Sequence, residues 1–465
     1  MKKIAVSAGL VAFGAAGIQT AMAAVSDVIS PKAWNIGVTL RAFYDDNYAI
    51  GTTSKGSGGF EISPTVSVNI PLRQTDLGFR YTYGLYYYQD RQDIGITPID
   101  QTHQFEVWMD HKFNTRWHLN ATDSFAVGQE PELLQSSTSQ PFRTKGDNIA
   151  NHASISLETQ WTHNFNTSFH YGNAFFDYEA AGATPMLVVP SSLAQLQAIG
   201  YSPSTPGFND GFFRSVAPSL SGSLDRVEQN AGIDFSWVLQ SETMLSVGYN
   251  FSLANYTGGE DIAAFNYSDS ATPPYNPRSL VYRSDSRDTM GHTIHVGLQH
   301  QFTANISGSF RVGASYTDSY NNPLSHDTSI SPYADISISY TYIPGSYVQF
   351  GVTHDINATD VVQPNATSGK ITSYQESSVV YASLNHKFNQ DLIGTIIGRF
   401  QNSTYHGGAN ENQNDQSYGV GINLHYQINQ HFSTEVGYNF DDLVSGLGNR
   451  SYERNRVYMG ISATY

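Results

Sequence analysis

The sequence predicts an all-β fold, a transmembrane antiparallel β-barrel of about eighteen strands, with sixteen strands as the alternative. Three observations carry this prediction. The N-terminus is that of an exported protein, apolar and polar residues alternate with a period of two along most of the chain, and a short motif recurs where one alternating run ends. The expected barrel has short periplasmic turns and long extracellular loops.

The N-terminus has the order of a secretory signal peptide. Two lysines precede an apolar stretch at residues 4–18, and small residues then lead to Ala23. The apolar stretch is shorter than the roughly 20 residues that a membrane anchor needs. We therefore expect cleavage after Ala23, a signal peptide at residues 1–23 and one continuous outer-membrane barrel at residues 24–465.

The composition excludes several classes of protein. Only 14% of the residues are charged, whereas 30 Tyr and 25 Phe stand beside 40 Gly, which suits strands with one apolar and one polar side. The chain has no cysteine, so a disulfide framework, a lipid-modified N-terminal cysteine and a thiolate metal site are excluded. Two of the 24 basic residues lie in the signal peptide, which leaves 22 against 40 acidic residues. This balance argues against nucleic acid or anionic lipid as a binding partner.

Alternation with a period of two is the main evidence for strands. In the last run, residues 456–465, Val457, Met459 and Ile461 occupy odd positions, and the even positions are mostly polar or Gly. A lipid-spanning strand shows apolar side chains outward and polar side chains to a watery lumen. The same pattern occurs at residues 245–253, 294–302, 334–342 and 418–428.

Short turns punctuate these runs. The string His-x-Phe-[Asn/Thr] occurs at residues 111–114, 163–166, 300–303 and 386–389. Similar tight joins occur at Pro71-Leu72, Gln240-Ser241, Pro344-Gly345 and Asn429-Gln430. These eight turns join sixteen strands, and an opening strand near residues 34–44 and a closing strand ending at Tyr465 give eighteen, with both ends in the periplasm. Because an open edge in lipid leaves unpaired amides that cost several kcal/mol each, we expect the first and last strands to pair.

Aromatic residues and histidines gather near the expected strand ends. The tyrosines Tyr81, Tyr83, Tyr86, Tyr87 and Tyr88 are expected to contribute to interfacial girdles. The four turn-motif histidines point outward by phase and are spread around the circumference. We therefore expect them to anchor the interface rather than to bind a metal.

These features together resemble a known group of proteins. The signal peptide, the alternating strands with Phe-Asn turns and the aromatic C-terminal residue resemble an outer-membrane β-barrel of the Putative beta-barrel porin 2 type. The resemblance covers essentially the whole chain after Ala23, although Tyr465 stands where many such barrels end in Phe. It implies a porin-like role in the cell outer membrane, among outer-membrane lipid, and relatives of this kind are also linked to export of extracellular polysaccharide. The C-terminal strand is expected to engage the barrel-assembly machinery.

The function of such a barrel depends on its lumen. Opposed charged clusters would set a transverse field across the pore, or they would pair across neighbouring strands and merely hold a polar wall. Three functions stay open: a channel for passive passage of small hydrophilic solutes or ions, a polysaccharide-export barrel, and a loop-plugged structural or surface-binding barrel. Phase counting predicts the pore-lining residues Arg41, Glu61, Arg80, Glu106, Asp110, Glu158, Asp234, Arg311, Asp335, Arg399, Glu435 and Arg456, with Lys112 and Lys387 also inward.

Two loops are candidates to cover the mouth. The longest, about residues 182–226, contains an apolar stretch and a predicted helix at residues 191–200, and we expect it to fold into or over the mouth. The loop at residues 256–287 is the second candidate. The sequence has no nucleophile elbow, no His-Glu-x-x-His and no phosphate-cradling glycine loop. We expect no enzyme activity, no metal site and no cofactor, and a homo-oligomer stays an open alternative.

Overall fold

A computed structural model describes residues 33–94, 97–128, 148–178, 185–187, 214–216, 220–268, 277–322, 327–363, 365, 370–448 and 450–465. The expected signal peptide and the predicted helix at residues 191–200 lie outside these residues. Of the helices in the described ranges, none is long and apolar enough to cross a membrane.

One antiparallel sheet of eighteen strands makes up most of the described chain. Each strand pairs with the sheet strands that precede and follow it along the chain, so the sheet is a simple meander. Its strands are β1 (Trp34–Asp45), β2 (Ser57–Pro71), β3 (Thr75–Tyr88), β4 (Ile99–Lys112), β5 (Trp117–Gly128), β6 (Asn148–Thr162), β7 (Phe165–Tyr178), β10 (Arg226–Gln240), β11 (Thr243–Tyr256), β14 (Thr289–Thr303), β15 (Ile306–Ser319), β16 (Asp327–Ile343), β17 (Ser346–Asn357), β18 (Thr372–Lys387), β19 (Leu392–Gly407), β20 (Asn414–Gln427), β21 (Phe432–Ser445) and β22 (Tyr452–Thr464).

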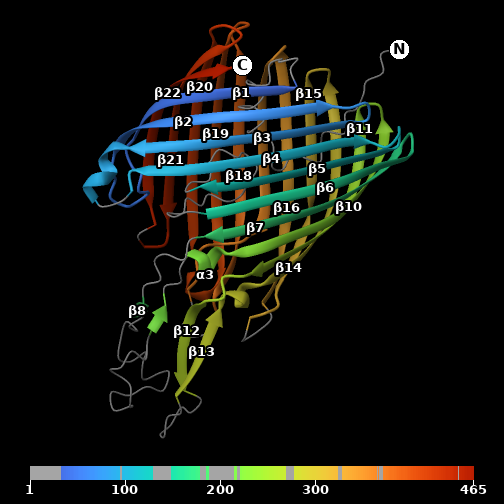
Figure 1. Cartoon of the computed structure of the whole chain (residues 1–465). Coiled ribbons are helices and arrows are strands. Elements are labelled where there is room, and N and C mark those ends of the chain that lie inside the picture. The colour runs from blue at the N-terminus through green and yellow to red at the C-terminus, as the bar shows by residue number, and fades with distance from the viewer. Residues whose placement is uncertain are drawn as a thin grey trace.

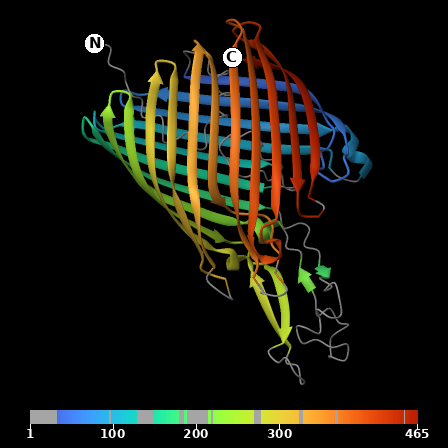
Figure 2. The same ribbon diagram turned by 180° about the vertical axis from the view of Figure 1, so that it is seen from behind.

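The sheet closes on itself through β1. Leu40 of β1 lies opposite Ile62 of β2 on one side and opposite Ile461 of β22 on the other. Closure removes both edges, as a lipid environment requires. In Figures 1 and 2 the strands β1–β7 run across the strands of the facing wall, as the tilt of barrel strands demands. The predictions of eighteen strands and of a first strand paired with the last are confirmed.

The two rims of the barrel differ. All eight predicted short turns join strands at one rim, the turn rim, where the Ile36 and Tyr465 backbones also pair. At the opposite rim, the loop rim, longer connections carry smaller elements, several of which project below the barrel in Figure 1. These elements are η1 (Gln89–Ile94), β8 (Pro185–Leu187), β9 (Arg214–Val216), α3 (Leu220–Leu224), β12 (Asp261–Ser268), β13 (Pro277–Arg283), η2 (Ser284–Arg287) and η3 (Gly408–Asn410).

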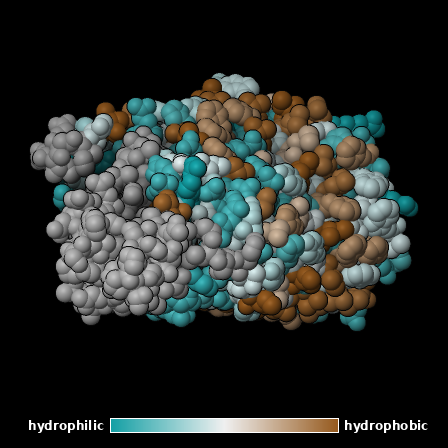
Figure 3. All heavy atoms as spheres, turned by 90° about the horizontal axis from the view of Figure 1, so that it is seen from below, coloured by the Kyte–Doolittle hydropathy of each residue, from teal (hydrophilic) through white to brown (hydrophobic). Residues whose placement is uncertain are grey.

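Exposed apolar side chains mark the outer face of the barrel. On β14, Ile294 and Val296 are 62% and 50% exposed, whereas His295 between them is 7% exposed. On β22, Val457 and Met459 are exposed in the same alternating way. Figure 3, which views the molecule from below, shows apolar side chains along the margin of that face and hydrophilic ones nearer its middle. The alternation therefore separates an apolar outer wall from a polar inner wall.

Two tyrosines predicted for an interfacial girdle face the interior instead. Phe79 is exposed on β3, so the odd positions of this strand face outward and Tyr86 and Tyr88 face inward. The Tyr88 ring is 2% exposed and lies 5.1 Å from the Phe43 ring and 5.8 Å from the Tyr48 ring. The prediction was wrong for Tyr86 and Tyr88 because residues adjacent in a strand point to opposite faces.

Candidate functional site

The inner wall carries the predicted pore-lining residues. Each lies on the side of its strand opposite to the exposed apolar side chains. Most are half-buried, from 19% exposure at the Asp234 side chain to 37% at Asp335. Glu61, Glu435 and Arg399 are instead buried within the wall. Their common role in lining a path for solutes stays a prediction.

An arginine cluster bridges the seam where the barrel closes. Arg41 of β1 donates to Glu61 of β2 at 2.9 Å and to Glu435 of β21 at 2.6 Å. Arg456 of β22 lies 3.9 Å from Glu61, and Asn423 of β20 donates to Glu435 at 3.2 Å. Each charge in this seam cluster thus has an opposite charge on another strand. Here the structure favours the alternative in which inward charges pair along the wall.

Four more of the predicted pore-lining residues form two ion pairs between neighbouring strands. Arg80 of β3 lies 3.3 Å from Glu106 of β4, and Arg311 of β15 lies 3.6 Å from Asp335 of β16. Both pairs are opposite each other in the strand register. Half-exposed ion pairs of this kind contribute about 0–1 kcal/mol, so they do little for stability. Their main effect is to keep charge of both signs on the lumen surface.

The remaining predicted carboxylates, Asp110, Glu158 and Asp234, lie beside histidines. The His118 cluster joins His118 of β5 to Asp110 of β4 at 2.6 Å and to Glu158 of β6 at 3.8 Å. The Asp234 cluster places Asp234 of β10 3.0 Å from His295 of β14 and 3.6 Å from His170 of β7.

Sequence reasoning missed these three histidines as site residues. His118, His170 and His295 occupy the same inward phase as the acidic residues beside them, and that phase could have identified them.

Part of the inner wall is open to water. Thr122 of β5 and Ser154 of β6 face inward and bond to each other at 2.7 Å, yet both are exposed. The His118 and Glu158 side chains nearby are each 24% exposed. Inward residues of a packed core would be buried, so this arc of the wall faces solvent-accessible space.

The connection between β17 and β18 lies across the loop rim. We define residues 358–363 as the crossing segment. The Thr359 carbonyl accepts a hydrogen bond from Arg287, the last residue of η2 in the connection to β14, and Asp360 pairs with Arg450 in the connection to β22. Arg287 and Arg450 therefore belong to connections on either side of β17 and β18 along the closed sheet. To contact both Arg287 and Arg450, the short crossing segment runs away from the barrel wall and over part of the mouth.

Apolar packing holds the end of this connection in place. Ile371, just before β18, is fully buried and packs with Ile262, Ala263 and Tyr282, and Val362 of the crossing segment packs against the same group. Ile262 and Tyr282 belong to the β12–β13 hairpin. The second loop predicted to cover the mouth, residues 256–287, thus meets the crossing segment there. Of the first loop, 182–226, the predicted helix lies outside the described residues.

Buried charges fasten the loop rim. Arg287 is fully buried, and its guanidinium also donates to the Ser223 carbonyl at 2.6 Å and lies over the Tyr256 ring. Burial lowers the pKa of Arg287 from its ordinary value. Burial disfavours the charged form of Asp225 as well and so raises its pKa, although its carboxylate accepts hydrogen bonds from Ser221 and from the Tyr178 amide. These contacts join α3, η2 and the crossing segment into one cover.

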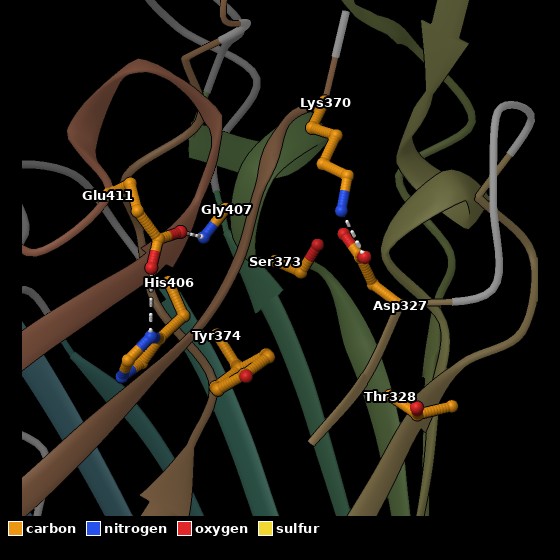
Figure 4. A pocket seen from close by; sticks show the side chains of 8 residues that line it. All are labelled: Asp327, Thr328, Lys370, Ser373, Tyr374, His406, Gly407 and Glu411. Atoms are coloured by element: carbon orange, nitrogen blue, oxygen red, sulfur yellow. Dashed lines mark hydrogen bonds and ion pairs between the residues drawn. The ribbon is translucent and has the colours of Figure 1, made fainter. Parts of the chain in front are cut away.

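A pocket of about 120 Å³ lies at the loop rim between β16, β18 and β19. Figure 4 shows Lys370 directed at Asp327, 2.5 Å away, and His406 beside Glu411, 3.3 Å away. His406 and Tyr374 lie in the outward phase of their strands and stack at 5.1 Å. The pocket is therefore separate from the inward-facing charges, and we assign no solute path to it.

Metal chemistry has no support in the described ranges. No group of three or more His, Asp or Glu residues there is arranged to hold a metal ion. The turn-motif histidines His111, His300 and His386 face outward, and each ring meets the phenylalanine two residues later edge-on at 4.4–4.6 Å. His163 lies in the turn between β6 and β7. Their expected role as interface anchors stays a prediction.

The closed sheet and its polar inner wall define a porin-like outer-membrane β-barrel. Residues 276–465, which include β14 to β22, match the model of the family described as Putative beta-barrel porin 2. This is the family that the sequence resembles. No curated protein matches the chain.

Solved outer-membrane structures are similar to the chain at low identity. A BenF-like porin from Pseudomonas fluorescens Pf-5 shares 9% identity at a TM-score of 0.43, and the match covers 93% of this chain and 99% of the porin chain. The outer membrane protein opdK from Pseudomonas aeruginosa shares 8% at 0.41, with the same coverage. The siderophore receptor PirA from Acinetobacter baumannii shares 10% at 0.41, covering 94% of this chain and 81% of its own.

Proposed function

We propose that the protein is an outer-membrane channel for the passive passage of small hydrophilic solutes or ions. The observation that carries this proposal is the water-accessible inner wall, where the inward side chains Thr122 and Ser154 are exposed inside a closed sheet. A closed barrel of this strand number is wide enough for an aqueous channel unless its interior is filled. Lipid on the outside and small hydrophilic solutes on the inside are the partners that this arrangement supports.

The crossing segment supports a channel with a limited opening. It covers part of the mouth and is held from two sides by Arg287 and Arg450. Solutes would have to pass beside it, where they would meet the charges of the inner wall. Such an arrangement favours small solutes over long polymers, so it supports the channel more than the export alternative.

Reconstitution of the purified protein tests the proposal. We expect discrete conductance steps in planar bilayers, and swelling of proteoliposomes in small sugars that fades as the sugar becomes longer. Heat-denatured protein added in the same detergent is the control. An absence of conductance steps would favour the loop-plugged alternative, and equal swelling in long oligosaccharides would favour export.

A further inference from the structure

The inward charges are distributed unequally around the barrel. In the seam cluster, Arg41 and Arg456 balance Glu61 and Glu435. These arginines stay charged at every working pH. Within the seam cluster, two permanent cations therefore face two carboxylates.

The opposite arc, from β4 to β17, has more inward carboxylates than permanent cations. Its permanent cations are Lys112, Arg226 and Arg311, and its carboxylates include Glu106, Asp110, Glu158, Glu228, Asp234 and Asp335. Around the His118 cluster, the carboxylates of Asp110 and Glu158 face one permanent cation, Lys112, which lies opposite His118 in the register. Carboxylates thus outnumber permanent cations in this cluster. The remaining side chain in this cluster that can add a positive charge is the imidazole of His118.

The Asp234 cluster has the same imbalance. Asp234 lies between His170 and His295, and Arg311 of β15 is the permanent cation near them; Arg311 also lies 3.6 Å from Asp335 of β16. Asn250 of β11 and the Tyr333 ring of β16, 5.7 Å from the His295 ring, complete the surroundings. One permanent cation, Arg311, therefore faces two carboxylates, Asp234 and Asp335, and two histidines can add positive charge.

We propose that the His118 and Asp234 clusters make the channel select cations at neutral pH and lose this preference when their histidines take up protons. The inference rests on the proposed channel function and names its solute class, small hydrophilic cations. Low-dielectric walls focus the electric field of uncompensated charges into the lumen. A small excess of carboxylates therefore raises the local concentration of cations. Protonation of His118, His170 and His295 cancels that excess.

The test is the reversal potential of the full-length protein in a planar bilayer under a potassium chloride gradient. At about pH 7.5 we expect a cation-to-anion permeability ratio above one, and at about pH 5 a ratio that falls to one or below, since protonated imidazoles add positive charge to the lumen. The triple variant His118→Gln, His170→Gln and His295→Gln should keep the neutral-pH ratio and lose the shift. Asp234→Asn combined with Glu158→Gln should lower the ratio at neutral pH.

His152→Gln is the matched control. His152 also faces inward, on β6, but its charged neighbours Arg226 and Glu228 pair with each other at 2.6 Å, so no carboxylate excess surrounds it. This variant should keep the full shift. A wild-type channel that conducts with a ratio independent of pH overturns the inference and leaves the channel function intact. A protein that conducts at neither pH overturns both.

Discussion

Asp360 and Arg450, 90 positions apart in the sequence, form a two-point ion pair with distances of 2.6 and 3.1 Å across the loop rim. Arg450 also reaches Asp415 at 3.1 Å. Burial opposes the charge of Arg450, but the carboxylates of Asp360 and Asp415 outweigh it and raise the pKa of the guanidinium. The crossing segment is thus fastened by a two-point ion pair whose guanidinium stays charged.

Replacing Asp360 by alanine should free the crossing segment. The expected result is a larger or more frequently fluctuating single-channel conductance, because the segment loses its contact with the β21–β22 connection. Glu411→Gln, which alters a carboxylate at the same rim outside the crossing segment, serves as the control. Identical conductance traces for Asp360→Ala and wild type would show that the segment does not limit passage.

Replacing Arg454 by methionine should destabilise the seam. Arg454 is 1% exposed and its guanidinium contacts the Asp45 carboxylate, which is fully buried. Removing one partner of a buried pair leaves an uncompensated charge and costs about 3–5 kcal/mol. Urea unfolding of the reconstituted barrel measures this loss, and the double variant with Asp45→Asn should recover part of it. An unfolding midpoint of Arg454→Met equal to that of wild type would show that the Arg454–Asp45 pair does not stabilise the barrel.

Adjacent residues on β14 should respond oppositely to arginine. Leu298 is 39% exposed on the outer face, and Gln299 beside it points inward. Leu298→Arg places a charge in lipid and should cost about 2–4 kcal/mol, whereas Gln299→Arg should cost much less because lumen substitutions mainly change selectivity. Unfolding in lipid vesicles compares the two. Equal losses would be inconsistent with the assignment of faces.

The cover of the loop rim should tighten as the pH falls. Because burial raises the pKa of Asp225, the folded rim binds this proton more strongly than the unfolded chain does. The contribution of Asp225 to stability therefore grows as the pH falls from neutral through the raised pKa. Hydrogen-exchange protection of the Asp225 amide, which donates to the Ser221 carbonyl at 3.0 Å at the end of α3, should increase. In Asp225→Asn the protection should not vary with pH; a pH effect as large as in wild type would assign it to another group.

The candidate site could be predicted from the sequence only in part. The inward phase of Arg41, Glu61 and Asp234 follows from alternation, because side-chain direction in a strand has a period of two. Their partners do not follow from alternation. Arg41 meets Glu435, 394 positions away, because β1 and β21 both lie beside β22 after closure. The inward turn of Tyr86 and Tyr88 was also missed, although the same phase counting would have found it.

The sequence by itself determined the eighteen strands, the short turns and the pairing of β1 with β22. The strands and turns follow from repeated local patterns, and the pairing of the first strand with the last follows because a sheet in lipid cannot leave an open edge with unpaired amides. Only the tertiary structure decided how the mouth is covered. The crossing segment carries no periodic pattern, and its position depends on Arg287 and Arg450, whose places around the rim are set only when the barrel closes.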